Sequence, residues 1–92
     1  MGKIILSGHI IVPVTDVAAV KAALIEHTRL TLAKTGCLVF RVKQDASNPQ
    51  IFSVYEKFTT QTDFDNHQKR VHNSEWGKVA KNVERHYTVT ST

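Results

Sequence analysis

Glu56 is one residue of this sequence whose surroundings could favour proton chemistry. It lies in the apolar run Ile51–Phe58, which has the alternation and the β-branched and aromatic content of a strand. Alternation puts three large apolar side chains on its face: Phe52, Val54 and Phe58. Burial there would raise the pKa of the carboxyl group, so Glu56 could accept or return a proton near neutral pH. The simpler interpretation is an ion pair at a strand end.

His67 is the second candidate. Together with Phe64 and Val71 it forms a stripe at positions i, i+3 and i+7 of a predicted helix, and this stripe should face the sheet. His67 would then point toward Glu56, and the pair could remove a proton from a bound molecule. The alternative is a core histidine with satisfied hydrogen bonds.

The first long helix becomes polar on its buried side in its second half. Thr28, Thr31 and Thr35 fall within the apolar arc, and His27 lies at its edge. Either the hydroxyls bond back to carbonyls of the preceding turn, or this half of the helix lines a polar cavity. In the second case we expect Thr31, Thr28 or His27 to contact oxygens of a substrate.

Aromatic side chains are expected to form the walls of such a cavity. Trp76 belongs to an inward stripe with Val79, Ala80 and Val83, and is either core or a pocket wall. The remaining expected wall residues come from strands: Phe40, Phe58 and either Tyr55 or Tyr87.

Metal chemistry is not indicated. His67 and His72 are five residues apart, about 140° around a helix, whereas helical ligand pairs use spacings of three or four. We therefore expect no metal site and place His72 at the cavity rim. Cys37 has no base near it in sequence, and neither a Gly-x-Ser-x-Gly motif nor a glycine-rich phosphate loop occurs, so no cofactor is expected.

The elements that position these residues follow the order β-α-β-β-α-β. The predicted elements are a strand His9–Val14, a helix from Thr15 or Asp16 to about Thr35 that stops at Gly36, strands Cys37–Lys43 and Ile51–Phe58, a helix from near Thr60 or Thr62 to Val71, a break at Asn73–Ser74, a short helix Glu75–Lys81, and a strand Glu84–Val89. This order predicts an α+β, ferredoxin-like fold with one four-stranded antiparallel sheet. Because both sheet faces look apolar, we expect a homodimer formed through the sheet.

Length and composition set further bounds. The 92 residues predict a single domain, 1–92, with a core of about 8–89. A single cysteine and the absence of a long apolar run favour a cytoplasmic protein without a membrane partner. The net charge of +4 comes from scattered lysines and arginines, and the aromatic pattern of an RNA-binding sheet is missing, so no nucleic-acid partner is expected.

Three segments, in this order, resemble the antibiotic biosynthesis monooxygenase (ABM) domain family of dimeric α/β barrels: TGCLVFRVKQD, NPQIFSVYEKF and DFDNHQ. The resemblance extends over about Gly8 to Val89. It implies a homodimer with one pocket per subunit, between sheet and helices, for small electron-rich or enolisable substrates. The glutamate of its Tyr-Glu-x-aromatic motif falls on Glu56, and the histidine of its Phe-x-x-His motif falls on His67. Phe58 stands where the family often has Trp, and the Asn, His and Trp set of haem-degrading members is absent.

These observations lead to one main hypothesis and two alternatives. The main hypothesis is a cofactor-independent monooxygenase for a small quinol, phenolic or enolisable compound, with dioxygen as co-substrate. His67 would remove the proton, and Glu56 would orient or charge the imidazole. The alternatives are an isomerase or lyase that acts on a small carbonyl compound without oxygen, and a dimeric ligand-binding module without catalysis.

Overall fold

A computed structural model describes residues 2–92 and confirms the predicted β-α-β-β-α-β order. The elements are β1 (Ile4–Ile11), the short 3-10 helix η1 (Val14–Asp16), α1 (Val17–Leu32), β2 (Cys37–Gln44), β3 (Ile51–Phe58), α2 (Gln61–His72), α3 (Glu75–Val79) and β4 (Glu84–Ser91). The fold is ferredoxin-like α+β, as the sequence predicts.

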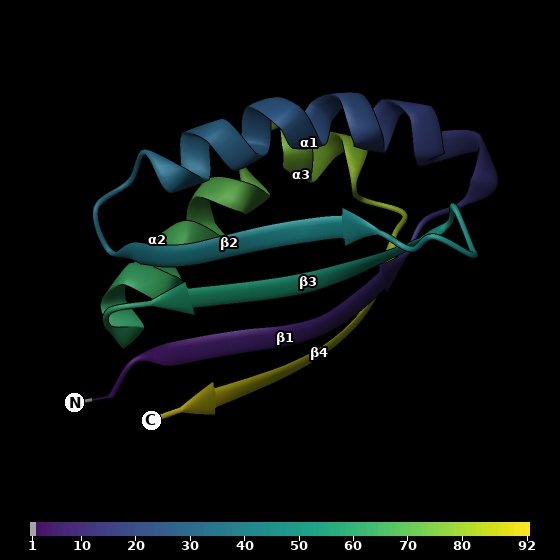
Figure 1. Ribbon diagram of the computed structural model, residues 1–92. Helices are drawn as coiled ribbons and strands as arrows, with labels where there is room; N and C mark the ends of the chain where they lie inside the picture. Colours follow the sequence, from purple (N-terminus) through teal and green to yellow (C-terminus); the bar gives the residue numbers. More distant parts are fainter. Residues whose placement is uncertain (1) are drawn as a thin grey trace.

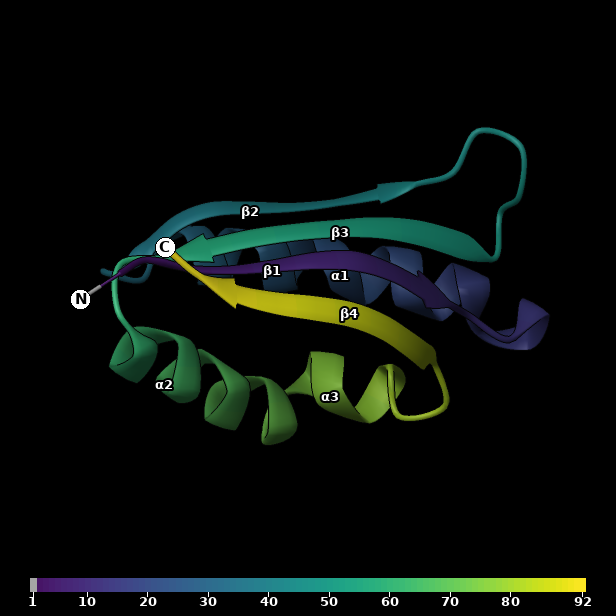
Figure 2. The same ribbon diagram turned by 90° about the horizontal axis from the view of Figure 1, so that it is seen from below.

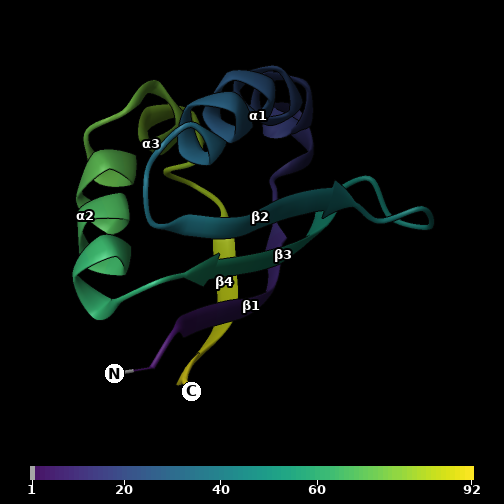
Figure 3. The ribbon, with the colours of Figure 1, turned by 60° about the vertical axis from the view of Figure 1, so that its left-hand side comes forward.

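The four strands form one antiparallel sheet in the order β2-β3-β1-β4 (Figure 1). β1 pairs with both β3 and β4, so Leu6 faces Glu56 on one side and Val89 on the other. Figure 2 shows α1 behind the sheet and α2 and α3 alongside β4. Figure 3 shows that all three helices lie on the same side of the twisted sheet. The helices and this face of the sheet therefore enclose the interior.

Helix starts follow local hydrogen bonding. The Thr60 hydroxyl caps α2 by accepting from the Asp63 N–H at 3.1 Å, and the Ser74 hydroxyl caps α3 by accepting from the Gly77 N–H at 3.2 Å. The predicted break at Asn73–Ser74 is thus confirmed. A side chain at Gly77 would place a Cβ 2.1 Å from the Val71 carbonyl oxygen, so only glycine lets α3 pack this closely on α2.

The first strand departs from the prediction. It spans Ile4–Ile11 rather than His9–Val14. The prediction missed its first half because Ser7 and Gly8 interrupt the apolar alternation there. A Cβ on Gly8 would lie 1.9 Å from the His86 carbonyl oxygen, so glycine is required where β1 meets β4. The strand ends early because Pro13 has no N–H to donate, and the chain turns there into η1.

Three other boundaries differ by two or three residues. α1 ends at Leu32 rather than about Thr35, and α3 ends at Val79 rather than Lys81. β4 continues past Val89 to Ser91, since its pairing with β1 extends to the end of that strand. Gly36, with a φ of 97°, lies three residues beyond the C-cap Ala33 of α1 and lets the chain reverse immediately before β2.

The core between sheet and helices is apolar but includes four buried polar residues. Its apolar members are Ile4, Leu6, Ile10, Val12, Val20, Phe52, Val54, Phe58, Phe64, Ala80 and Val83. The polar ones are His27, Thr31, Glu56 and His67. All four were singled out by periodicity in the sequence. Across residues 2–92, no helix is both long and apolar enough to cross a membrane.

Candidate active site

A cavity of about 520 Å³ lies between the helix-facing side of the sheet and the helices. Every strand contributes to it: Leu6 and Ile10, Phe40 and Val42, Val54 and Glu56, Arg85 and Tyr87. The helical side consists of His27, His67, Gln68, Val71, His72, Trp76, Gly77 and Lys78. Lys81 and Val83, from the connection between α3 and β4, complete the lining. This size suits a small organic molecule.

Glu56 and His67 meet inside this cavity. Nε2 of His67 lies 3.6 Å from Oε1 of Glu56, and the two side chains are only 2% and 9% exposed for the histidine and the glutamate. Oε1 of Glu56 is buried without a hydrogen-bond partner among residues 2–92. A buried carboxyl oxygen with no partner costs stability, and such groups are found where a ligand or a reaction uses them.

Burial changes the protonation of both groups. It raises the pKa of Glu56 to about 7, since a charged carboxylate loses its hydration there. The same burial, followed by the charges of His27 and Arg70, lowers the pKa of His67 to about 4. At neutral pH the imidazole is therefore neutral and the carboxyl group is partly ionised. Glu56, rather than His67, has the pKa suited to a general base at neutral pH.

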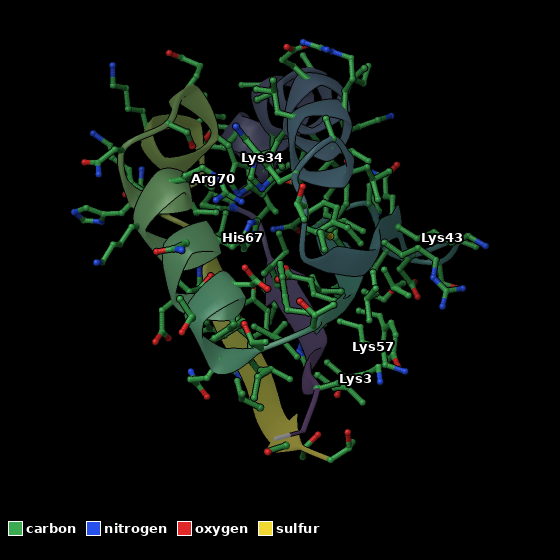
Figure 4. All side chains as sticks on the ribbon, turned by 90° about the vertical axis from the view of Figure 1, so that its left-hand side faces the viewer. Lys3, Lys34, Lys43, Lys57, His67 and Arg70 are labelled. Carbon is green, nitrogen blue, oxygen red and sulfur yellow. The ribbon has the colours of Figure 1, made fainter. Side chains whose placement is uncertain are left out.

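Aromatic rings surround the two imidazoles. His27 stacks on Trp76 with ring centroids 5.0 Å apart and planes 6° from parallel. Phe40 packs edge-on against His27 at 5.3 Å, and Phe58 lies 5.0 Å from His67. Burial, followed by the charge of Arg70, lowers the pKa of His27 to about 4, so it too is neutral at neutral pH. Figure 4 shows His67 and Arg70 extending from α2 toward the space between the helices and the sheet.

The expected wall residues divide into three groups. Phe40, His27, His72 and Trp76 line the cavity, with His72 exposed as a rim residue should be. Phe58 and Thr31 are buried but do not line it; Phe58 instead supports the His67 ring from behind.

Tyr55 requires a correction, because it does not line the cavity. Alternation along β3 turns it to the opposite face of the sheet, where the Arg41 guanidinium lies 5.5 Å from the centre of its ring. Of the two tyrosines between which the prediction did not decide, Tyr87 of β4 is the one that lines the cavity. Burial, and then the charge of Glu56, raises the pKa of Tyr87 to about 12, so its hydroxyl is a proton donor at neutral pH.

Residues 5–79 match the sequence profile of the antibiotic biosynthesis monooxygenase (ABM) family. The chain belongs to this family. The matched range includes Glu56, His67 and Trp76 but ends before β4, which supplies Arg85 and Tyr87 to the cavity of this ABM protein.

Solved structures share the fold across nearly the whole chain. A conserved protein of unknown function from Bacteroides thetaiotaomicron superposes with a TM-score of 0.83 at 18% identity, covering 99% of this chain and 98% of the other. A candidate antibiotic biosynthesis monooxygenase from Nitrosomonas europaea gives 0.81 at 19% identity, with 100% and 90% covered. A protein from Pseudomonas aeruginosa gives 0.79 at 16% identity, with 100% and 93% covered. No curated protein matches the sequence.

The cationic part of the ABM cavity was missed at the sequence level. Lys78, Lys81 and Arg85 line the cavity but come from α3, from the following connection and from β4. As isolated charges in the sequence they look like an ordinary solvated surface. For Arg85 a signal existed, because alternation in β4 puts it on the same face as Tyr87.

Metal-ligating groups do not gather within residues 2–92: no three His, Cys, Asp or Glu side chains are arranged to hold an ion. His9 and His86 stack with centroids 4.7 Å apart, and His86 lies 2.7 Å from a Glu84 oxygen. This group lies on the face of the sheet opposite to the ABM cavity, because its residues alternate with Ile10, Arg85 and Tyr87.

Proposed function

We propose that this ABM protein is a cofactor-independent monooxygenase for a small quinol, phenolic or enolisable compound. The observation that carries the proposal is the buried pair of Glu56 and His67, which faces a cavity with aromatic walls. A substrate anion forms in this site only if a nearby group takes the proton, and a carboxyl group with a pKa of about 7 can do so.

The proposed reaction needs only the substrate, dioxygen and this pair. Glu56, assisted by neutral His67, accepts a proton from an activated CH₂ or phenol-conjugated carbon. The resulting carbanion reduces dioxygen and forms a carbon–oxygen bond, and the peroxide anion takes the proton back from the pair. Loss of water, with removal of the second proton from that carbon, leaves a carbonyl group. The balance is R₂CH₂ + O₂ → R₂C=O + H₂O.

The walls have separate roles in this proposal. Trp76 and Phe40 would hold the ring of the substrate, and His27 would donate or accept a hydrogen bond at a substrate oxygen. Phe58 supports His67 without touching the substrate. His72 lies at the rim, where it contacts the part of the substrate nearest to solvent.

The dimer belongs to the same proposal. The sheet face away from the helices carries half-buried apolar side chains along its middle strands: Ile5, Ile11, Ile51 and Tyr55. A second copy packed on this face would remove them from water. Multi-angle light scattering at micromolar concentration should give the mass of a dimer, and a monomer mass would contradict this part of the proposal.

Oxygen uptake tests the reaction directly. Purified protein is mixed with hydroquinones, dihydroxynaphthalenes and hydroxyanthrones in an oxygen electrode, and spontaneous oxidation is subtracted using Glu56→Gln protein. We expect uptake of one dioxygen per substrate for at least one compound, and ¹⁸O from labelled dioxygen in the product. Uptake that is the same with Glu56→Gln as with the unchanged protein would overturn the proposed mechanism.

An isomerase or lyase is the second candidate. The neutral His67 beside Glu56 supports it as well as it supports the monooxygenase. Such a pair moves a proton between two positions of a carbonyl compound without any oxidant. Turnover under argon separates the two functions, since the monooxygenase requires dioxygen and the isomerase does not. Ligand binding without turnover in either atmosphere would identify a non-catalytic binding module.

A further inference from the structure

Three cationic side chains form part of the rim of the ABM cavity: Lys78, Lys81 and Arg85. Each lines the cavity and each is also exposed, which places them where the cavity opens to solvent. None of them forms an ion pair with any residue in the described range 2–92. Even Glu75, which precedes Lys78 by one helical turn, makes no ion pair with it. The opening is therefore positively charged, and its charge is uncompensated.

Among residues 2–92, the only acidic residue of the lining is Glu56, which lies in the buried part of the cavity. Glu56 is buried, and its pKa is raised by burial alone, with no cation close enough to lower it. The rim cations therefore do not serve to stabilise the Glu56 carboxylate. The cavity has two chemically distinct ends, a proton-accepting interior and a cationic opening.

Arg85 is held in place by the chain around it. Its guanidinium donates to the carbonyl oxygen of Ala80 at 3.2 Å and to that of Val83 at 3.5 Å. The Tyr87 hydroxyl also accepts from this guanidinium. The N–H groups that remain free belong to a planar fork that suits a carboxylate or a phosphate. Because the side chain is already ordered, little conformational entropy is lost when an anion binds.

We propose that the molecule bound in this cavity carries an anionic group, a carboxylate or a phosphate, that pairs with Lys78, Lys81 and Arg85. Its ring or enolisable carbon extends from this group into the aromatic interior and reaches Glu56 and His67. The position of the reacting carbon rests on the proposed function, whereas the anion site does not. The substrate class is thereby narrowed from small quinols and enols to their acidic derivatives.

Binding of matched pairs of compounds tests the anion site without any turnover. Isothermal titration calorimetry under argon compares 2,5-dihydroxybenzoate with the neutral 2,5-dihydroxybenzamide, and phenyl phosphate with phenol. We expect at least one anionic member to bind about tenfold or more tightly than its neutral partner, with an affinity that falls as salt is added. The two pairs also show whether carboxylate or phosphate is preferred.

Charge removal identifies the residues responsible. Lys78→Gln/Lys81→Gln should weaken the preferred anion about tenfold and change its neutral partner by less than about twofold. The control is Lys21→Gln/Lys69→Gln, which removes the same charge from exposed helical positions outside the cavity and should leave both ligands unchanged. All four lysines are exposed, so both double variants should fold.

Three outcomes would overturn the anion site: no binding of either anion at millimolar concentration, equal affinity for charged and neutral members, or equal effects of the two double variants. Failure of the proposed function is a different result. Anion-selective binding without oxygen uptake leaves the anion site standing and removes the oxygenase. Oxygen uptake with neutral quinols alone would support the oxygenase and remove the anion site.

Discussion

The imidazole of His67 approaches the carboxyl group of Glu56 to 3.6 Å without forming a hydrogen bond. Both side chains are buried, and the facing carboxyl oxygen has no other partner among residues 2–92. In an ordinary structural pair the two groups would close to about 2.8 Å and satisfy one another. The gap leaves the Glu56 oxygen free to bind the hydrogen of a third group, which is the position of a substrate in the proposed reaction.

Replacing either member of the pair should lower turnover more than binding. For Glu56→Gln we expect a decrease in kcat of about 10²- to 10⁴-fold, the range for loss of a general base, with a much smaller change in KM. His67→Gln should also lower kcat. Steady-state oxygen uptake with a confirmed substrate measures both parameters. His72→Gln is the control, because His72 lies at the exposed rim. An equal fall of kcat in this variant would show that the loss is not specific to Glu56 and His67.

The rate should depend on the protonation of Glu56. Since burial raises the pKa of this carboxyl group to about 7, the base is present above pH 7 and is lost as the pH falls below it. We expect kcat/KM to rise with pH through about 7 and then level off. In His67→Gln the rise should persist with lower amplitude, whereas the residual rate of Glu56→Gln should not show it. A rise centred near pH 4 in the unchanged protein would assign the base to His67 instead.

The raised pKa of Glu56 should also affect the unfolding free energy. Glu56 has a folded-state pKa above its ordinary value of 4.5, so its charge destabilises the fold increasingly as the pH rises from about 4.5 to 7. Glu56→Gln removes this cost, which a shift of this size sets at about 3 kcal/mol at most. Urea unfolding should therefore give Glu56→Gln the larger unfolding free energy at pH 8 and no advantage at pH 4.5. A less stable variant at pH 8 would show that the ionised carboxylate is paired in the fold.

In the unchanged protein the two buried histidines have the opposite effect on the unfolding free energy, which they increase as the pH rises. His27 and His67 have folded-state pKa values of about 4 against an ordinary 6.5, so the stability they provide is complete above pH 6.5 and is lost as the pH falls toward 4. The three pKa shifts are of similar size, so the gain in stability from the two histidines exceeds the loss from Glu56. The unfolding free energy should thus rise between pH 4 and 6.5, and more steeply in Glu56→Gln.

Periodicity predicts the buried half of the site because strands and helices fix which side chains share a face. Glu56 lies among Phe52, Val54 and Phe58 at every second position, and His67 lies between Phe64 and Val71 at helical spacing; the structure buries both. The same alternation places Tyr55 on the face opposite to Glu56. This pattern therefore already favoured Tyr87 over Tyr55 as the wall residue, and Tyr87 is the one that lines the cavity.

The cationic rim could not be predicted in this way. Lys78, Lys81 and Arg85 belong to three consecutive segments whose relative placement depends on how α3 packs on α2 and how β4 joins the edge of the sheet. Each residue alone is an ordinary surface cation, and only tertiary structure brings the three to one opening. The first half of β1 was missed for a local reason, since Ser7 and Gly8 interrupt its pattern where another strand comes close.

The caps of α2 and α3 provide a matched pair that separates stability from positioning. Thr60→Ala and Ser74→Ala each remove one hydroxyl that accepts from a backbone N–H, so each should cost about 1 kcal/mol of unfolding free energy. Only Ser74 begins the helix that carries Trp76 and Lys78 to the cavity, and its hydroxyl also donates to the Val71 carbonyl oxygen at 2.9 Å. Ser74→Ala should therefore raise KM or the ligand Kd several-fold, whereas Thr60→Ala should not. Trp76 is the single tryptophan, so its fluorescence reports ligand binding in both variants. Equal changes in Kd would mean that loss of stability, rather than the position of α3, controls binding.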